Sequence, residues 1–122
     1  MAVINNSGST NTPAYTLTIN QDGSGSLIYQ KDDQERFKNY VNKTFPVGTF
    51  PSAQLQTILT QIKDMRTIPN HGCIKSISFG STTTITYQGK TSGDLSCLSS
   101  TDPKIFQDLR DLVQSFYARI YK

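Results

Sequence analysis

Apolar and polar residues alternate near the start of the chain, which is typical of a half-buried β-strand. Tyr15, Leu17 and Ile19 are apolar, and the residues between them are polar. The glycine-containing segment 22–25 then allows a tight reversal, and extended structure resumes at residues 27–29. The pattern predicts a β-hairpin.

A second alternating stretch lies in the C-terminal half. Ile77 and Phe79 alternate with serines, and Ile85 and Tyr87 alternate with threonines. Turns are predicted at Gly80-Ser81 and at residues 88–90, so this region is interpreted as a β-meander.

A weaker apolar pattern follows the first hairpin. Phe37, Val41 and Phe45 recur with wide spacing after a charged stretch. This spacing fits either a third strand or an irregular crossing segment, and we interpret it as a strand.

Two segments carry apolar residues at helical spacing. The first follows Pro51, and Ser52 is expected to accept the free backbone N–H groups of its first turn. The second begins with Asp102 as the cap and Pro103 at the first helical position. The apolar stripe of the first helix is Leu55, Ile58, Leu59, Ile62 and Met65. The buried face of the second is Ile105, Phe106, Leu109, Leu112, Val113, Phe116 and Ile120.

The order of these elements predicts the fold class. A hairpin with a third strand precedes one helix, and a meander precedes the other, which favours an α+β domain with an antiparallel sheet and both helices on one face. We expect residues 14–122 to form this single domain. Residues 1–13 carry no charge, no aromatic residue and no sustained period, so they are predicted to be a flexible leader, such as a spacer behind a removed export signal or lipid anchor.

Composition excludes several classes of function. The chain has 122 residues, which suffices for one hydrophobic core without a metal. A net charge of +3, dispersed along the sequence, gives no basis for nucleic-acid binding. No apolar run approaches the roughly 20 residues of a membrane-spanning helix.

The two cysteines indicate a disulfide. Cys73 and Cys97 bracket the predicted meander, and a bond between them is worth roughly 3 kcal/mol in the chain-entropy model. Structural disulfides persist mainly in oxidising compartments, so we expect a secreted, periplasmic or surface-tethered protein whose export signal is not part of this sequence. The alternative is a cytosolic protein with two buried free thiols.

Candidate catalytic residues are sparse. His71 is the single histidine, zinc-ligand spacing is lacking, and no phosphate-binding loop or nucleophile elbow occurs. The sequence therefore predicts no catalytic residue, no metal and no cofactor. The alternative is a small hydrolase whose site is assembled from distant residues such as His71, Asp22 and Asp94.

The polar face of the predicted sheet is the better candidate for a functional surface. Its side chains are short and uncharged, so they lose little entropy on contact with a protein or a glycan. The members of this predicted binding face are Thr16, Thr18, Ser76, Ser78, Thr82, Thr84 and Thr86. The simpler explanation is that threonine is favoured on exposed strands. A non-enzymatic extracytoplasmic binding module is therefore the leading hypothesis, and a purely structural envelope domain is a further alternative.

The stretch from Tyr15 to Tyr121 combines an Asp-Gly hairpin, a Leu-X-X-Ile-Leu helix, a cysteine-bracketed meander and an Asp-Pro-capped final helix. In this style it resembles small uncharacterised secreted or lipoprotein-type bacterial domains. The layout is also similar to that of β-lactamase-inhibitor-type proteins, in which a sheet face grips a partner. The first resemblance implies no catalytic residues, and the second is a similarity at the level of fold only.

Overall fold

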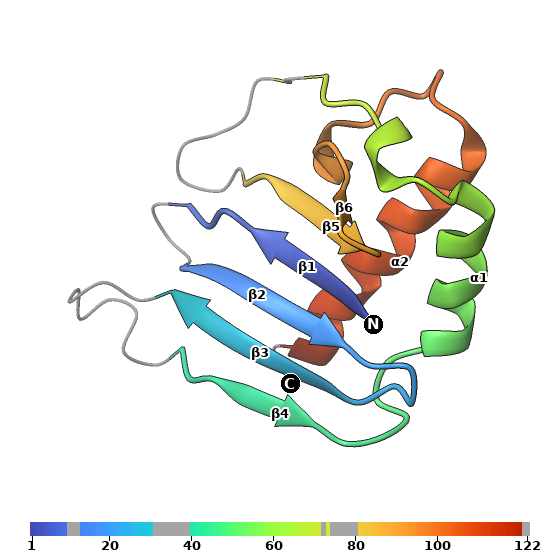
Figure 1. Ribbon diagram of the computed structural model, residues 1–122. Helices are drawn as coiled ribbons and strands as arrows, with labels where there is room; N and C mark the ends of the chain where they lie inside the picture. The colour runs from blue at the N-terminus through green and yellow to red at the C-terminus, as the bar shows by residue number, and fades with distance from the viewer. Residues whose placement is uncertain (10–12, 31–39, 72, 74–80, 121–122) are drawn as a thin grey trace.

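The computed structural model describes residues 1–9, 13–30, 40–71, 73 and 81–120. Its strands form one antiparallel sheet in the order β4-β3-β2-β1-β5-β6, and α1 and α2 both cover the same face of that sheet (Figure 1). The predicted two-layer α+β fold is confirmed. The strands are β1 (Ala2–Asn6), β2 (Ala14–Ile19), β3 (Gly25–Gln30), β4 (Lys43–Phe45), β5 (Thr83–Tyr87) and β6 (Lys90–Thr91). The helices are α1 (Ser52–Ile62), α2 (Lys104–Ile120) and the short 3-10 helices η2 (Met65–Thr67) and η3 (Leu95–Cys97).

The largest departure from the sequence prediction is β1. Residues 2–6 were expected to belong to a flexible leader, but they form a strand between β2 and β5 and pair with both along their whole length. The prediction is wrong there because the apolar alternation of this strand is incomplete. Ala2 and Ile4 are apolar inward residues, but the third inward residue, Asn6, is polar. The Asn6 side chain donates to the hydroxyls of Ser81 and Thr83, so its burial is compensated.

The first predicted hairpin is confirmed. Tyr15, Leu17 and Ile19 are buried in β2, and β3 pairs with β2 over its full length after the turn at residues 20–24. In that turn, the Asp22 carboxylate accepts from the backbone N–H and the hydroxyl of Ser24. These bonds lower the pKa of Asp22 and make it a turn residue.

The two edge strands are short. Within the described residues, the predicted third strand is β4, three residues long, and Phe37 lies outside them. Each edge strand contains one lysine, Lys43 in β4 and Lys90 in β6. Short edges with lysine discourage pairing between sheets of different molecules.

Helix α1 buries the predicted apolar stripe. Leu55, Ile58, Leu59 and Ile62 are all buried, and Met65, also buried, already belongs to η2. The expected capping role of Ser52 is wrong. Pro51 is the cap residue, and the Ser52 hydroxyl donates to the backbone carbonyl of Gln21 at 2.8 Å. The helix is thereby tied to the β2–β3 turn.

Helix α2 runs antiparallel to α1 and buries the predicted residues from Phe106 to Ile120, with Ile105 half-buried. Its start differs in detail from the prediction, because the first helical backbone bonds go to the Pro103 carbonyl. The Asp102 carboxylate accepts instead from the Ser99 backbone N–H and from His71. No helix within the described ranges is long and apolar enough to cross a membrane.

Candidate binding face

Four residues of the predicted binding face lie together on the side of the sheet that faces away from the helices. Thr16 and Thr18 project from β2, and Thr84 and Thr86 project from β5; each alternates with inward-facing buried residues. Thr82 is exposed just before β5. The remaining two predicted members, Ser76 and Ser78, lie outside the described residues.

Strand β1 joins these two pairs of threonines into one surface. Val3 lies opposite both Thr18 and Thr86, and Asn5 lies opposite both Thr16 and Thr84. Sequence reasoning missed Val3 and Asn5 because it treated their segment as a leader. The signal that could have found them is the alternation of Ala2, Ile4 and Asn6 with these outward residues.

The register extends this surface across the whole sheet. One continuous row carries an outward residue from every strand, in the order Thr44, Ser26, Thr18, Val3, Thr86 and Thr91. A second row consists of Ile28, Thr16, Asn5 and Thr84. Neighbouring strands are about 4.8 Å apart, so side chains within a row contact one another. We call these ten residues the outer face, and none of them is charged.

Hydrogen bonds within the outer face fix some of its side chains. The Thr16 hydroxyl donates to the Asn5 side-chain carbonyl at 2.9 Å. The hydroxyls of Thr86 and Thr91 are 2.8 Å apart. These contacts restrict rotamers before any partner binds, which lowers the entropy cost of binding at this surface.

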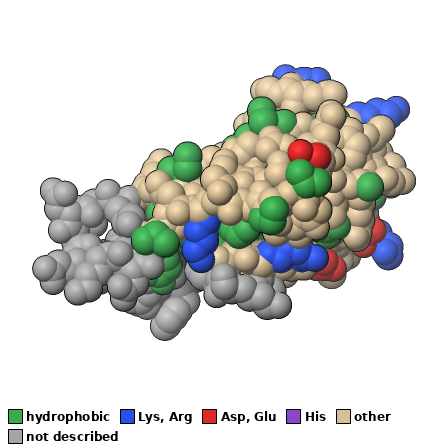
Figure 2. Space-filling view, turned by 90° about the horizontal axis from the view of Figure 1, so that it is seen from below, with side chains coloured by type: hydrophobic (Ala, Val, Ile, Leu, Met, Phe, Trp, Pro, Cys, Tyr) green, Lys and Arg blue, Asp and Glu red, His purple; other side chains and the backbone are tan. Residues whose placement is uncertain are grey.

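Exposed apolar side chains are scattered around the β4 edge. Ile28 on β3 is 54% exposed, and Val41 and Val47, which flank β4, are 52% and 69% exposed. Figure 2 shows the molecule from below, where hydrophobic side chains form small separate patches, some of them beside Lys, Arg, Asp or Glu side chains. Such scattered apolar groups do not amount to a hydrophobic interface.

The predicted disulfide is present. Cys73 and Cys97 are bonded, with their Cα atoms 5.6 Å apart, and the bond ties the segment after η2 to η3. Beside it, His71 Nε2 lies 2.8 Å from Oδ2 of Asp102. The pKa of Asp102 is lowered, chiefly because its carboxylate accepts from the Ser99 backbone N–H and also because it bonds to His71.

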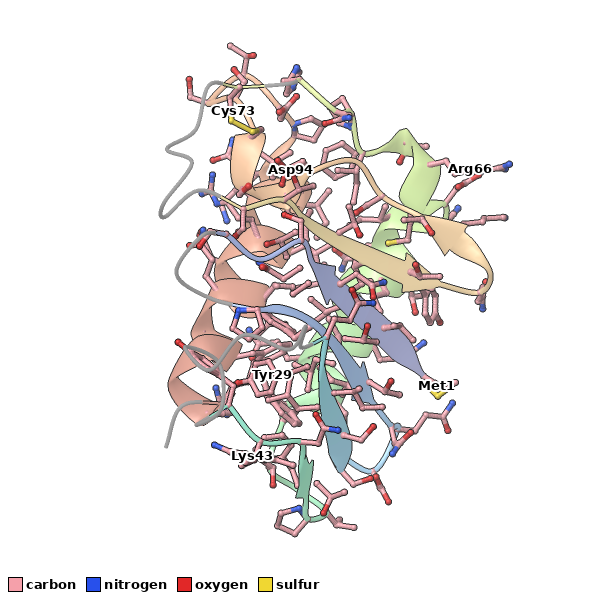
Figure 3. The ribbon with its side chains drawn as sticks, turned by 90° about the vertical axis from the view of Figure 1, so that its left-hand side faces the viewer. Met1, Tyr29, Lys43, Arg66, Cys73 and Asp94 are labelled. Atoms are coloured by element: carbon pink, nitrogen blue, oxygen red, sulfur yellow. A yellow bond between two sulfur atoms is a disulfide. The ribbon has the colours of Figure 1, made fainter. Side chains whose placement is uncertain are left out.

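The residues of the alternative hydrolase site have separate partners. His71 pairs with Asp102, and Asp22 bonds to Ser24 within its turn. Asp94 is buried at the end of the sheet near the disulfide. In Figure 3 it lies below Cys73 and far above Met1. It accepts from the backbone N–H groups of Thr83 and Ser96 and from the Ser96 hydroxyl. The structure gives Asp94 a role in holding β5 to η3 and does not join it to His71.

A groove of about 720 Å³ separates the exposed sides of α1 and α2. Its α1 wall is uncharged, since the whole helix contains no charged residue. Its α2 wall carries Asp108 and Asp111, each already paired with a neighbouring cation, Lys104 and Arg110. It also carries Arg119, whose guanidinium donates to the backbone carbonyls of Thr49 and Ser115. These ion pairs leave the groove without a strong excess of either charge.

No metal site is assembled within the described ranges, where no three His, Cys, Asp or Glu side chains lie close enough to hold an ion.

Comparison with protein-family models, with curated proteins and with solved structures finds no match. The resemblance to small secreted bacterial domains and to inhibitor-type proteins therefore remains a hypothesis drawn from the sequence.

Proposed function

We propose that the protein is a non-enzymatic extracytoplasmic binding module and that the outer face is its contact surface. The observation that carries this proposal is the row of six outward residues, one from each strand, that contains hydroxyl and methyl groups and no charge. Short side chains lose little conformational entropy when a partner immobilises them, so binding to this row has a small entropy cost.

The placement of the helices supports this assignment. Both α1 and α2 cover the opposite side of the sheet, so the outer face has no layer of described structure over it (Figure 1). A sheet with one side on the core and one side solvated is common, and its solvated side usually includes charged residues. The outer face departs from that composition, which favours a role in contact.

The extracytoplasmic location rests on the disulfide. The bond between Cys73 and Cys97 needs an oxidising compartment to persist in an ordinary mesophilic cell. Such a bond also stabilises a small domain, because it constrains the unfolded chain.

Substitution on the two sides of the molecule tests the proposal. Thr84→Lys introduces a long charged side chain in the second row of the outer face, and Thr57→Lys makes the same change on the exposed side of α1. Labelled protein is incubated with the envelope fraction of the source cells, and the retained amount is measured. We expect T84K to lose retention and T57K to keep it.

Equal retention of both variants would refute the outer face as the contact surface.

The proposal that the protein is not an enzyme has its own test. The purified domain is assayed for hydrolysis of ester, peptide and phosphate substrates, and turnover that disappears in His71→Ala would establish the hydrolase alternative instead.

A further inference from the structure

The two cysteines of the disulfide differ in exposure. Cys73 is exposed, whereas Cys97 in η3 is only 7% exposed. In Figure 3 the bond between the two sulfur atoms lies beside Cys73, near the upper end of the molecule. A thiolate that attacks a disulfide has to reach one of its sulfur atoms, and the rate depends on which sulfur is accessible. An attacking group in solvent therefore meets Cys73 first.

The chain segments that lead to the two cysteines pack against each other independently of the bond. The backbone N–H of Gly93 donates to the Ile68 carbonyl at 3.0 Å. A Cβ at Gly93 would lie 2.3 Å from the Pro69 carbonyl oxygen, so the two backbones are in close contact. This contact should hold the approach to Cys73 beside the approach to Cys97 when the bond is open.

A second connection lies nearer the bond. Oδ2 of Asp102 lies 2.8 Å from Nε2 of His71, which precedes Cys73 by two residues. The same carboxylate oxygen accepts from the backbone N–H of Ser99 at 2.7 Å, and Ser99 follows Cys97 by two residues. One carboxylate therefore joins the chain before Cys73 to the chain after Cys97.

The short helix η3 holds Cys97 by hydrogen bonds of its own. The backbone N–H of Cys97 donates to the Asp94 carbonyl at 3.1 Å. The buried Asp94 carboxylate accepts from the backbone N–H groups of Ser96 and Thr83, each at 3.0 Å. Cys97 should therefore stay in place when its bond to Cys73 is broken.

A disulfide in this setting should open and close reversibly. Once the bond is broken, the surrounding contacts keep the Cys97 thiol near Cys73, at an effective concentration on the order of millimolar or more. Exposed disulfides are also more easily reduced than enclosed ones, and labile, regulatory and catalytic disulfides belong to the exposed group. The exposure of Cys73 and the contacts around it favour exchange chemistry at this bond.

We propose that Cys73 is a thiol-exchange site, at which an external thiol forms a mixed disulfide with the domain. The external thiolate attacks Sγ of Cys73, a new sulfur–sulfur bond forms there, and the bond to Cys97 breaks. Cys97 leaves as a thiolate and takes up a proton, which balances the proton that the external thiol has lost. Attack by Cys97 on Cys73 reverses the reaction and expels the external thiol. The site goes beyond the proposed binding function and does not depend on the outer face.

Two single variants compare the cysteines in the absence of the bond. Cys97→Ala leaves the Cys73 thiol, and Cys73→Ala leaves the Cys97 thiol, so both variants lose the same cross-link. Each folded variant is treated with oxidised glutathione, and the mixed disulfide is measured by intact mass. We expect C97A to react at least about tenfold faster than C73A, because a buried thiol reacts only when the fold opens locally. Equal rates would contradict the proposal.

The wild type provides a measurement that does not depend on the folding of a variant. Folded protein is treated with reduced glutathione, quenched with acid and digested, and the position of the glutathione is mapped by mass spectrometry. We expect glutathione on Cys73 with Cys97 as a free thiol, and we expect the original bond to return when the adduct is moved to neutral buffer. Glutathione on Cys97, or reduction only in concentrations of urea that unfold the domain, would overturn the proposal.

The same thiol chemistry can come from a small molecule or from a protein. A thioredoxin whose second active-site cysteine is replaced by serine traps mixed disulfides and serves as the protein probe. A covalent complex through Cys73 supports a protein thiol, whereas an adduct with glutathione alone supports a small thiol. If neither reagent reacts at Cys73, the proposal is wrong and the bond is a structural cross-link only. The test of the outer face with T84K is unaffected by either result.

Discussion

His71 and Asp102 are 31 positions apart in the sequence, yet His71 Nε2 lies 2.8 Å from Oδ2 of Asp102. The contact joins the segment after η2 to the residues that precede α2. The disulfide between Cys73 and Cys97 makes a second link in the same region. Two independent cross-links therefore hold this corner of the domain, and each can be removed separately.

Loss of the disulfide should weaken the domain without changing its sheet. The bond closes a loop with a sequence separation of 24, so replacing both cysteines by serine should lower the free energy of unfolding by about 3 kcal/mol. Urea unfolding followed by circular dichroism measures this change. A reducing agent should destabilise the wild type to the same extent and leave the double variant unaffected. An identical unfolding midpoint for the reduced and oxidised wild type contradicts the prediction.

The acid side of the stability profile should depend on Asp102 and Asp64. Arg66 bonds to Asp64 and lowers the pKa of that carboxyl to about 2, and the Ser99 backbone N–H together with His71 lowers the pKa of Asp102. A carboxyl whose pKa is lower in the folded state stabilises the fold above its unfolded pKa of 3.8. That contribution is lost as the pH falls through the folded pKa.

The comparison to make is between the wild type and the variants Asp102→Asn and Asp64→Asn. At pH 7 each variant should be less stable than the wild type, and the difference should shrink below pH 3.8 as the wild-type carboxyl becomes protonated. Urea midpoints measured from pH 7 down to about pH 2 give the difference at each pH. Differences that stay constant over this range would show that neither carboxylate contributes through its charge.

The elements that sequence reasoning predicted best are those with a long, regular apolar period. The seven-residue apolar face of α2 and the alternation of β2 and β5 were read correctly, because burial of an apolar face imposes the period directly. The β5–β6 turn was also anticipated from its glycine.

Strand β1 could not be recognised in the same way. It is short, and only two of its inward residues are apolar; the third, Asn6, is buried because Ser81 and Thr83 lie beside it in space. The predictions of the helix caps were wrong for a related reason. The Ser52 hydroxyl bonds to Gln21 and the Asp102 carboxylate bonds to His71, both in distant segments, instead of capping their own helices. Four of the ten outer-face residues were predicted, and its central residues, Val3 and Asn5, were missed together with β1.

Gly93 should tolerate no side chain. A Cβ at this position would lie 2.3 Å from the carbonyl oxygen of Pro69 and 2.7 Å from the backbone nitrogen of Asn70, and backbone atoms cannot move aside cheaply. Gly93→Ala should therefore lower the free energy of unfolding by about 2 to 3 kcal/mol. Gly89→Ala is the control, since its Cβ meets open space and only its left-handed φ costs about 1 kcal/mol. Equal urea midpoints for the two variants would be inconsistent with the close packing of residues 69–70 on Gly93.

The position of β1 in the middle of the sheet gives the sharpest contrast between neighbouring residues. Ile4 is 1% exposed on the inward side, whereas Val3 faces outward in the first row of the outer face. Ile4→Ala should cost about 3 kcal/mol, because it leaves a cavity between the sheet and the helices. Val3→Ala should cost less than about 1 kcal/mol, because an outward residue has little packing to lose. Chemical unfolding of both variants measures these changes. If residues 2–6 were a flexible leader, neither substitution would change the unfolding midpoint. A large decrease in the midpoint of I4A alone identifies β1 as the strand that joins the two halves of the sheet.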